Sequence, residues 1–244
     1  MANYVYGIVR KAMRPPSHRG IGDAPLQLIG DDGAAALVSE LPTERLEMGR
    51  EELLTHARVL EEALDHGPVL PMRFGVVLED PDAVRRDLLE AHGDELLSQL
   101  EQFDGKVEMR VRVTYDEEPL MREIVRDNPE ITRMRESIRG KPEAATYYDR
   151  IRLGELIADA AERKRYAEGQ QILDLLAAGA AAVEVADPAH ERVVLDASFL
   201  LERKRLPEFD DLVERIAREQ AERLRVKLTG PLPPHSFVQL SGAA

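Results

Sequence analysis

Short apolar runs separated by turn residues open the chain. Residues 4–9, Tyr-Val-Tyr-Gly-Ile-Val, are aromatic or β-branched apart from the glycine, which predicts a first strand. Two further apolar runs, at 26–29 and 36–38, flank Asp31-Asp32-Gly33. Because an Asp-Gly step between two apolar runs favours a tight turn, these runs are predicted to pair as a β-hairpin.

Helical spacing begins near residue 50. Apolar residues recur on one stripe over 51–64, which predicts an amphipathic helix. An apolar run over 69–78 predicts a buried strand. Asp80 and Pro81 then provide an N-cap and a first-turn proline for a helix that runs to about Phe103. The first half is thus predicted as β-β-β-α-β-α.

The pattern changes to strict alternation after Gly105. Apolar residues at every second position over 107–115 alternate with polar residues, which are Glu108, Arg110, Arg112 and Thr114. A period of two is typical of a strand with one buried face. The four polar side chains are therefore expected on a solvated face.

Helices are predicted to follow this strand. Prolines at 119, 129 and 142 are expected to divide the first helical region into shorter pieces. A longer helix is then predicted from about Tyr147 to Ala178. Thirty residues would extend roughly 45 Å, so part of this helix would project as an arm or the helix would break at Gly169.

The last third contains a second predicted hairpin and a final helix. Apolar runs at 183–185 and 193–195 flank Asp187-Pro188, and the second run continues to Leu201. Pro207 opens a helix with an apolar stripe, and a short apolar segment at 226–228 leads into a proline-rich tail. The second half therefore has the order β-α-β-β-α-β, which is the ferredoxin-like order.

These elements predict an α+β protein with two domains. We expect an N-terminal α+β domain over residues 1–104. The C-terminal domain is expected over 105–244, with a ferredoxin-like fold, a long crossover helix and the proline-rich tail. No low-complexity linker separates the two.

Composition and charge restrict the function. The 244 residues are 43% hydrophobic and 32% charged, which is typical of a soluble globular protein. Cysteine is absent, which excludes disulfides, cysteine-based metal sites and thiol catalysis. The formal net charge of −13 argues against a nucleic-acid partner. Neither a signal peptide nor an apolar run of roughly 18 residues is present, so we expect a cytoplasmic protein without a membrane span.

Motifs for catalysis, metals and cofactors do not emerge. No two of the six histidines have helical i, i+4 spacing, and His190-Glu191 lacks a following histidine, so no metal site is predicted. Gly20-Ile21-Gly22 lacks the third glycine of a dinucleotide loop, so no cofactor is predicted. There is no Gly-x-Ser-x-Gly elbow, and the adjacent His235 and Ser236 would point to opposite faces. No catalytic residue is predicted.

Two segments contain unusual residues. Arg73 and Phe74 lie within an otherwise apolar run, and an unpaired buried guanidinium would be costly. Arg73 is therefore expected either to form a structural ion pair or to make a recognition contact. Residues 229–237 are rich in proline, which suits a fixed sheet edge or a docking surface.

Three segments together resemble the gas vesicle protein L/F family. They are Tyr4-Val5-Tyr6-Gly7-Ile8, Pro71-Met72-Arg73-Phe74-Gly75 and Gly230-Pro231-Leu232-Pro233-Pro234-His235-Ser236-Phe237. Their spacing covers essentially the whole chain, and Phe199-Leu200-Leu201-Glu202-Arg203 fits the same pattern. Two positions depart from it, because Leu232 stands where the family usually has Trp and His235 where it usually has Tyr.

The resemblance implies a non-enzymatic accessory protein of gas vesicle assembly. Such a protein would bind the small hydrophobic shell protein, or act at the gas-facing inner wall, together with other gas vesicle accessory proteins. It would need no cofactor. The candidate structural or interaction residues are Arg73, Phe74, Pro231, Pro233, Pro234 and Phe237.

Two alternatives stay open. Ferredoxin-like domains commonly bind metabolites, so the chain could be an enzyme or a sensor with an unrecognised pocket. It could also be a structural scaffold in which the long helix, near residues 155–172, mediates self-association.

Overall fold

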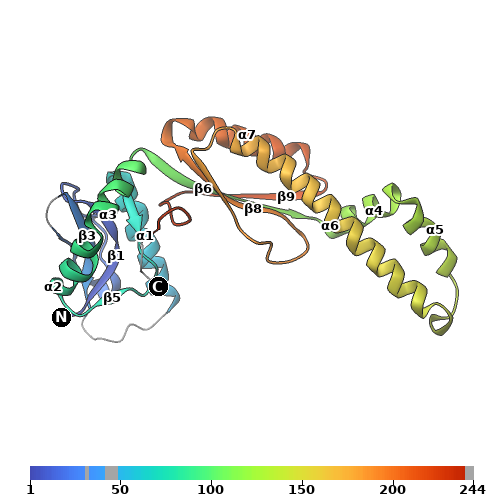
Figure 1. Ribbon diagram of the computed structural model, residues 1–244, viewed down its shortest axis with the longest axis horizontal. Coiled ribbons are helices and arrows are strands. Elements are labelled where there is room, and N and C mark those ends of the chain that lie inside the picture. Colours follow the sequence, from blue (N-terminus) through green and yellow to red (C-terminus); the bar gives the residue numbers. More distant parts are fainter. Residues whose placement is uncertain (31–32, 42–48, 240–244) are drawn as a thin grey trace. The chain divides into compact units, whose positions relative to one another are not determined.

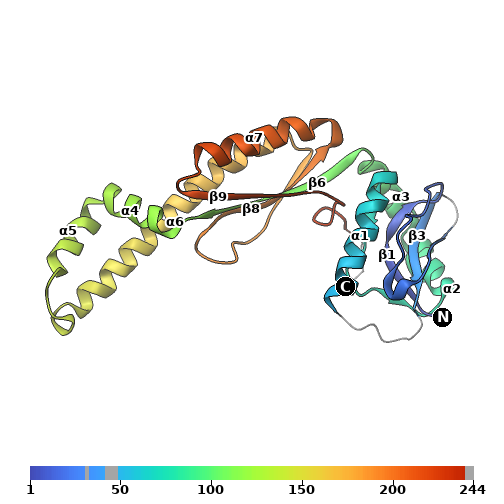
Figure 2. The same cartoon turned by 180° about the vertical axis from the view of Figure 1, so that it is seen from behind.

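The computed structural model describes residues 1–30, 33–41 and 49–239. The chain forms two compact units. The first unit contains residues 1–109, 200–203 and the chain from 230 onward, and the second unit contains residues 110–199 and 204–229. Figures 1 and 2 show the elements of both units from opposite sides.

The first unit contains an antiparallel sheet. Its strands have the order β2-β3-β1-β4, and β5 also pairs with β1. Their bounds are Asn3–Arg10 for β1, Leu26–Ile29 for β2, Ala34–Glu40 for β3, Val69–Pro71 for β4 and Val77–Leu78 for β5. In the register, Tyr4 is opposite Ser39 and Ile8 is opposite Leu70. The predicted pairing of β2 with β3 is confirmed, whereas its turn residues Asp31 and Asp32 lie outside the described residues.

The predicted strand over 69–78 is wrong as a single element. The structure contains the short strands β4 and β5, separated by a turn at Phe74 and Gly75. An apolar run cannot distinguish one buried strand from two short strands joined by a turn.

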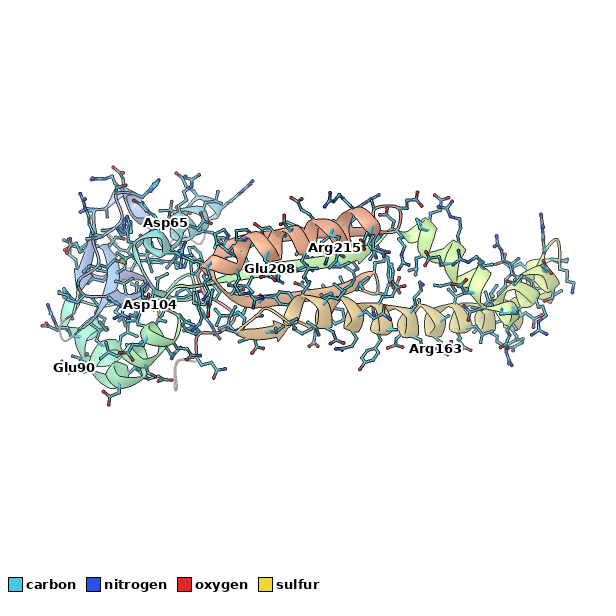
Figure 3. All side chains as sticks on the ribbon, turned by 90° about the horizontal axis from the view of Figure 1, so that it is seen from above. Asp65, Glu90, Asp104, Arg163, Glu208 and Arg215 are labelled. Atoms are coloured by element: carbon cyan, nitrogen blue, oxygen red, sulfur yellow. The ribbon has the colours of Figure 1, made fainter. Side chains whose placement is uncertain are left out.

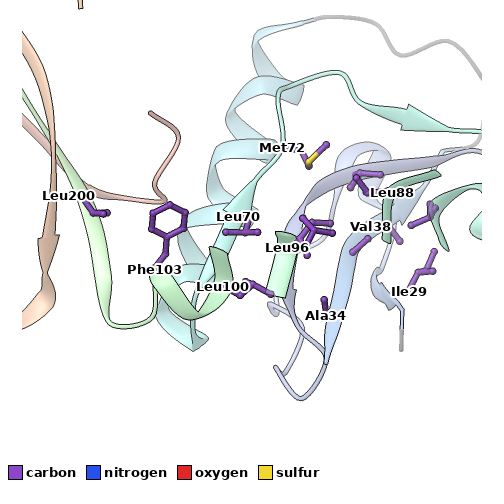
Figure 4. Packing of buried hydrophobic residues seen from close by; sticks show 14 residues of the cluster. Ile29, Ala34, Val38, Leu70, Met72, Leu88, Leu96, Leu100, Phe103 and Leu200 are labelled. Atoms are coloured by element: carbon purple, nitrogen blue, oxygen red, sulfur yellow. The ribbon is translucent and has the colours of Figure 1, made fainter. Parts of the chain in front are cut away.

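The two predicted helical segments are present and pack against this sheet. The bounds are Arg50–His66 for α1, Pro81–Ala83 for α2, Val84–Glu90 for a π-helical stretch and Ala91–Gln102 for α3. The carboxylate of Asp80 accepts a hydrogen bond of 2.7 Å from the amide of Ala83, so it is the predicted N-cap. Figure 4 shows the apolar core of the first unit, which includes Leu70, Leu96 and Phe103.

The second sheet has the strand order β7-β8-β6-β9. The bounds are Lys106–Tyr115 for β6, Ala182–Val185 for β7, Val193–Glu202 for β8 and Leu224–Leu232 for β9. The amide of Tyr115 donates a hydrogen bond to the carbonyl of Arg192, and the amide of Arg203 donates one to the carbonyl of Gly105. Because the ends of β6 meet opposite ends of β8, the two strands are antiparallel.

Four helices accompany this sheet. The bounds are Glu117–Asp127 for α4, Pro129–Ile138 for α5, Tyr147–Ala177 for α6 and Leu206–Glu219 for α7. Figures 1 and 2 show α6 and α7 on the same side of the sheet. The chain leaves the helical conformation before Pro129 and around Pro142, as predicted. Pro119 does not interrupt α4, because it lies in the first turn, where a helix tolerates a missing amide donor.

The long helix α6 is continuous over 31 residues and does not break at Gly169. A Cβ atom at Gly169 would lie 2.5 Å from the carbonyl oxygen of Val194. The glycine therefore allows α6 to approach β8 closely.

Charged side chains cover the helices of the second unit. Figure 3 shows Arg163 on α6 and both Glu208 and Arg215 on α7. Within the described part of the chain, no helix is both long and apolar enough to cross a membrane.

Candidate interaction surface

The proline-rich tail folds back onto the first unit. Pro233 and Pro234 are buried, Phe237 is half-buried against the core of this unit, and Pro231 is exposed. Gly230 has φ +139°, and a Cβ atom there would lie 2.8 Å from the carbonyl oxygen of Glu108. Only glycine combines this backbone conformation with such a close approach to β6. The tail is therefore anchored by residues from each part of its motif.

A buried carboxylate holds the end of the tail. Glu108 is only 2% exposed. Its Oε2 accepts a hydrogen bond from the amide of Ser236, and its Oε1 accepts one from the Ser236 hydroxyl, both at 2.8 Å. The expectation that Glu108 lies on a solvated face is wrong. The tail supplies the donors that make burial of this carboxylate tolerable.

Arg73 is exposed and lies outside the strands. No ion-pair partner for it occurs among residues 1–30, 33–41 and 49–239, so the expected structural ion pair is absent from this part of the chain. Because its guanidinium remains in solvent, it needs no partner. The apolar run concealed a turn that places this side chain outside the core.

Phe74 belongs to an aromatic group around His56. The ring centroids of Phe74 and His56 are 5.7 Å apart, and His56 also stacks on Tyr6. The Tyr4 hydroxyl lies 2.8 Å from His56 Nδ1 and accepts a hydrogen bond from the amide of Gly75. The group thus joins α1, β1 and the turn after β4.

Burial lowers the pKa of His56 to about 4, and the neighbouring His235 acts in the same direction. Burial also raises the pKa of Tyr4. The imidazole and the phenol are therefore both neutral near pH 7. Since His235 belongs to the tail, the tail and Phe74 both lie near His56.

Sequence reasoning missed both Glu108 and His56. Alternation placed Glu108 in solvent, because the pattern of one strand does not show that a distant segment returns to cover it. The available signal was Ser236, which lies in the tail segment that resembles the family and could have indicated a partner for a buried carboxylate. His56 lies on the apolar stripe of α1, and this position could have indicated a buried neutral histidine.

Charged side chains in the second unit form a linked group. Glu168 on α6 accepts hydrogen bonds from Tyr115 and Arg223, and Lys164 Nζ lies 2.9 Å from both Glu168 and Glu123. Although burial opposes ionisation, the bonds from Lys164, Tyr115 and Arg223 lower the pKa of Glu168. Since its charges pair with one another, this group ties α4 and α6 to the start of β9.

A groove of about 550 Å³ lies in the second unit between α6 and the β7–β8 hairpin. Its lining combines apolar residues such as Leu173, Val185 and Val194 with charged residues such as Glu162 and Arg163. Two of its residues are unusually exposed for their type, Tyr166 at 75% and Val185 at 54%. Because β7 is an edge strand, the groove adjoins backbone without a strand partner on its outer side among the described elements. Such a surface can accept an extended apolar segment.

In the part of the chain that the structure describes, no three histidine or carboxylate side chains lie where they could together hold a metal ion.

Fold and sequence comparisons define the class of protein. The fold is mixed α and β with two sheets, and it matches the crystal structure of GvpF from Anabaena sp. with a TM-score of 0.85 and 26% identity over 98% of this chain and 99% of that chain. GvpF from Microcystis aeruginosa gives a TM-score of 0.80 at 26% identity and the same coverage.

The family model for the gas vesicle synthesis protein GvpL/GvpF matches residues 2–239, so the chain belongs to this family. It is 35% identical to gas vesicle protein F of a Streptomyces species over 98% of this chain and the full length of that protein. The resemblance noted from the three segments is confirmed. Family membership associates the protein with gas vesicles and their assembly.

Proposed function

We propose that this protein is a non-enzymatic assembly factor that binds the small hydrophobic shell protein of the gas vesicle. Membership of the GvpL/GvpF family supports a role in gas vesicle assembly. The exposed groove beside β7 supports binding of an apolar segment. A subunit that lines a gas-filled space needs an apolar face, which is an aggregation hazard before assembly. A partner with a formal net charge of −13 stays soluble and repels its own copies.

The groove is the observation that carries this proposal. Tyr166 and Val185 project from opposite sides of it, one from α6 and one from β7. An extended apolar segment could add to the edge of β7 through main-chain hydrogen bonds and place alternate side chains in the groove. The opposite edge, β9, is a weaker candidate, because exposed charges at Arg225 and Lys227 and a proline at 231 discourage strand addition.

The six sequence-derived residues divide between two proposed roles. Pro231, Pro233, Pro234 and Phe237 would be structural, because their segment holds the tail on the first unit. Arg73 and Phe74 would take part in contacts with a partner protein. Arg73 is exposed, and Phe74 packs in the turn next to it.

The proposal extends to the fold and to location. We take the strand order β7-β8-β6-β9, with helices between β6 and β7 and between β8 and β9, as support for a ferredoxin-like second domain with a long crossover helix. The division into domains 1–104 and 105–244 stays a prediction, which limited proteolysis can test.

We also propose a location. A cytoplasmic protein placed at the inner wall would resist protease in intact vesicles and become cleavable after collapse.

Co-expression with the shell protein tests binding directly. We expect the shell protein to become more soluble and to co-purify with the wild-type chain. Replacing both groove residues, Tyr166→Ser with Val185→Ser, should reduce the co-purified amount by about tenfold. Tyr148→Ser is the matched control, because Tyr148 is an exposed tyrosine on the same helix and does not line the groove.

Failure of the wild-type chain to co-purify or to change shell-protein solubility would contradict the proposal. Equal losses in Tyr148→Ser and in the double variant would exclude the groove as the site. If deleting residues 155–172 changed only the oligomeric size in size-exclusion chromatography and left shell-protein binding intact, the scaffold alternative would be favoured. Turnover or tight binding of a metabolite would favour the enzyme or sensor alternative.

A further inference from the structure

Among the described elements, no helix covers one face of the second sheet, and that face carries basic residues. Phe199 on β8 contacts Phe209 on α7 with ring centroids 5.3 Å apart, so the helices cover the face to which Phe199 points. On β6, Val111 and Val113 are buried, while Arg110 is exposed and Arg112 half-exposed. Because successive side chains on a strand point to opposite faces, the two arginines belong to the open face.

The register of β6 and β9 adds a third cation to this face. The amide of Asp116 bonds to the carbonyl of Arg223 at 2.9 Å, and Gly230 packs closely on Met109. These two contacts fix an antiparallel register in which Arg112 is opposite Lys227. Directly opposite residues have Cβ atoms roughly 5 Å apart. Lys227 is exposed and has no ion-pair partner among the described residues.

A single buried carboxylate holds the two arginines. Asp196 on β8 is only 4% exposed. It accepts hydrogen bonds of 2.8 and 3.0 Å from Nε and Nη2 of Arg110, and Nε of Arg112 lies 3.2 Å from its Oδ2. We call Arg110, Arg112, Lys227 and Asp196 the basic strip, and its three cations outnumber its one carboxylate.

Other charges lie at the margins of the strip. Arg225 pairs with Asp116 at 2.5 Å, near the end of β6. Glu184 is exposed on β7, on the far side of β8 from β6. The excess of cations at the centre of this face therefore contrasts with the formal net charge of −13 for the chain.

We propose that the basic strip binds an acidic segment of a partner protein. Like charges directly opposite on neighbouring strands destabilise a sheet, and an incoming carboxylate between Arg112 and Lys227 would relieve that repulsion. Asp196 fixes the guanidinium of Arg110 through two hydrogen bonds and pairs with that of Arg112, so Arg110 loses little rotamer freedom on binding. Alternate residues of an extended segment lie roughly 7 Å apart on one side, which allows successive carboxylates to meet successive cations.

The negative charge of the rest of the chain favours a protein segment over a nucleic acid as the partner. Nucleic acid carries a dense line of phosphates and would be repelled by the acidic remainder of the chain. A short acidic peptide has to approach only the strip. Asp196 also lines the groove, but the three cations of the strip do not, and the inference does not depend on binding in the groove.

Fluorescence anisotropy of a labelled hexaglutamate peptide with the full chain tests this inference. We expect binding at about 0.01 M salt that disappears at about 1 M salt, because the screening length falls from about 30 Å to about 3 Å. Lys227→Gln should weaken binding about threefold, and Lys227→Glu should weaken it more. Lys227 has no partner to lose, so both variants should fold.

Lys141→Glu is the matched control, because Lys141 is an exposed lysine outside the sheet. Unchanged binding in this control with loss in Lys227→Glu would support the strip. Absence of wild-type binding at low salt, or equal weakening in both variants, would overturn the inference. Binding of an oligothymidylate as tight as that of the peptide would overturn the assignment to an acidic protein segment.

Discussion

Ser236 donates two hydrogen bonds to Glu108, one from its backbone amide and one from its hydroxyl, each at 2.8 Å. The two residues are 128 positions apart in the sequence. Each carboxylate oxygen thus receives one donor from the tail, and Glu108 is buried beneath it. This pair gives the serine of the tail motif a structural role.

Removing the Ser236 hydroxyl should lower stability. In Ser236→Ala, Oε1 of Glu108 loses its donor while the backbone bond to Oε2 remains. A hydrogen bond to a charged group contributes about 1.5–3 kcal/mol, so we expect a loss in the lower part of this range in urea unfolding. Ser98→Ala on the exposed face of α3 is the control and should change stability by less than about 0.5 kcal/mol. A neutral Ser236→Ala would show that the tail contact does not hold in solution.

Stability should fall when the pH drops from about 6.5 to about 4. The pKa of His56 is lowered from 6.5 to about 4 by burial, so the unfolded state binds a proton first as the pH falls. The contribution is present above pH 6.5 and is lost as the pH falls toward 4. Glu62, whose pKa is lowered to about 2, loses its contribution only at lower pH.

Urea unfolding at pH 7 and at about pH 4.5 measures this dependence. His56→Phe should reduce the difference in unfolding free energy between the two pH values, because it removes the titrating group. His190→Phe, at an exposed histidine, is the control and should leave the difference unchanged. A pH dependence that persists in full in His56→Phe would contradict the assignment.

A methyl group at Gly169 should destabilise the second unit. In Gly169→Ala the new Cβ atom would meet the carbonyl of Val194, which forces α6 away from β8. We expect a loss of about 1–3 kcal/mol from this overpacking. Gly154→Ala in the same helix has open space around its Cβ and should gain up to about 1 kcal/mol from helix propensity. Equal effects of the two variants in thermal unfolding would argue against the close contact.

The sequence predicted most elements because their local signals agree. The stripe over 51–64, the Asp80-Pro81 helix start and the alternation after Gly105 each predicted the element that the structure contains. The prediction failed where distant contacts decide the outcome. Glu108 is covered by a tail that returns from the far end of the chain, and Gly169 is required by a neighbouring strand rather than by a helix break.

The candidate residues show the same division between local and distant information. The tail motif left open a fixed sheet edge or a docking surface, and the structure shows that Pro233 and Pro234 within it are buried. Arg73 was expected within a strand, because an apolar run does not reveal the turn at Gly75. The groove beside β7 depends on residues from α6 and from the β7–β8 hairpin, and no single sequence pattern identifies it.

Flotation of a vesicle-forming host tests the central claim most directly. Deleting the gene should abolish buoyant, gas-filled particles, and the wild-type chain should restore them. The Tyr166→Ser and Val185→Ser double variant should restore far fewer particles than Tyr148→Ser at equal protein levels. Unchanged flotation without the gene product would contradict the account.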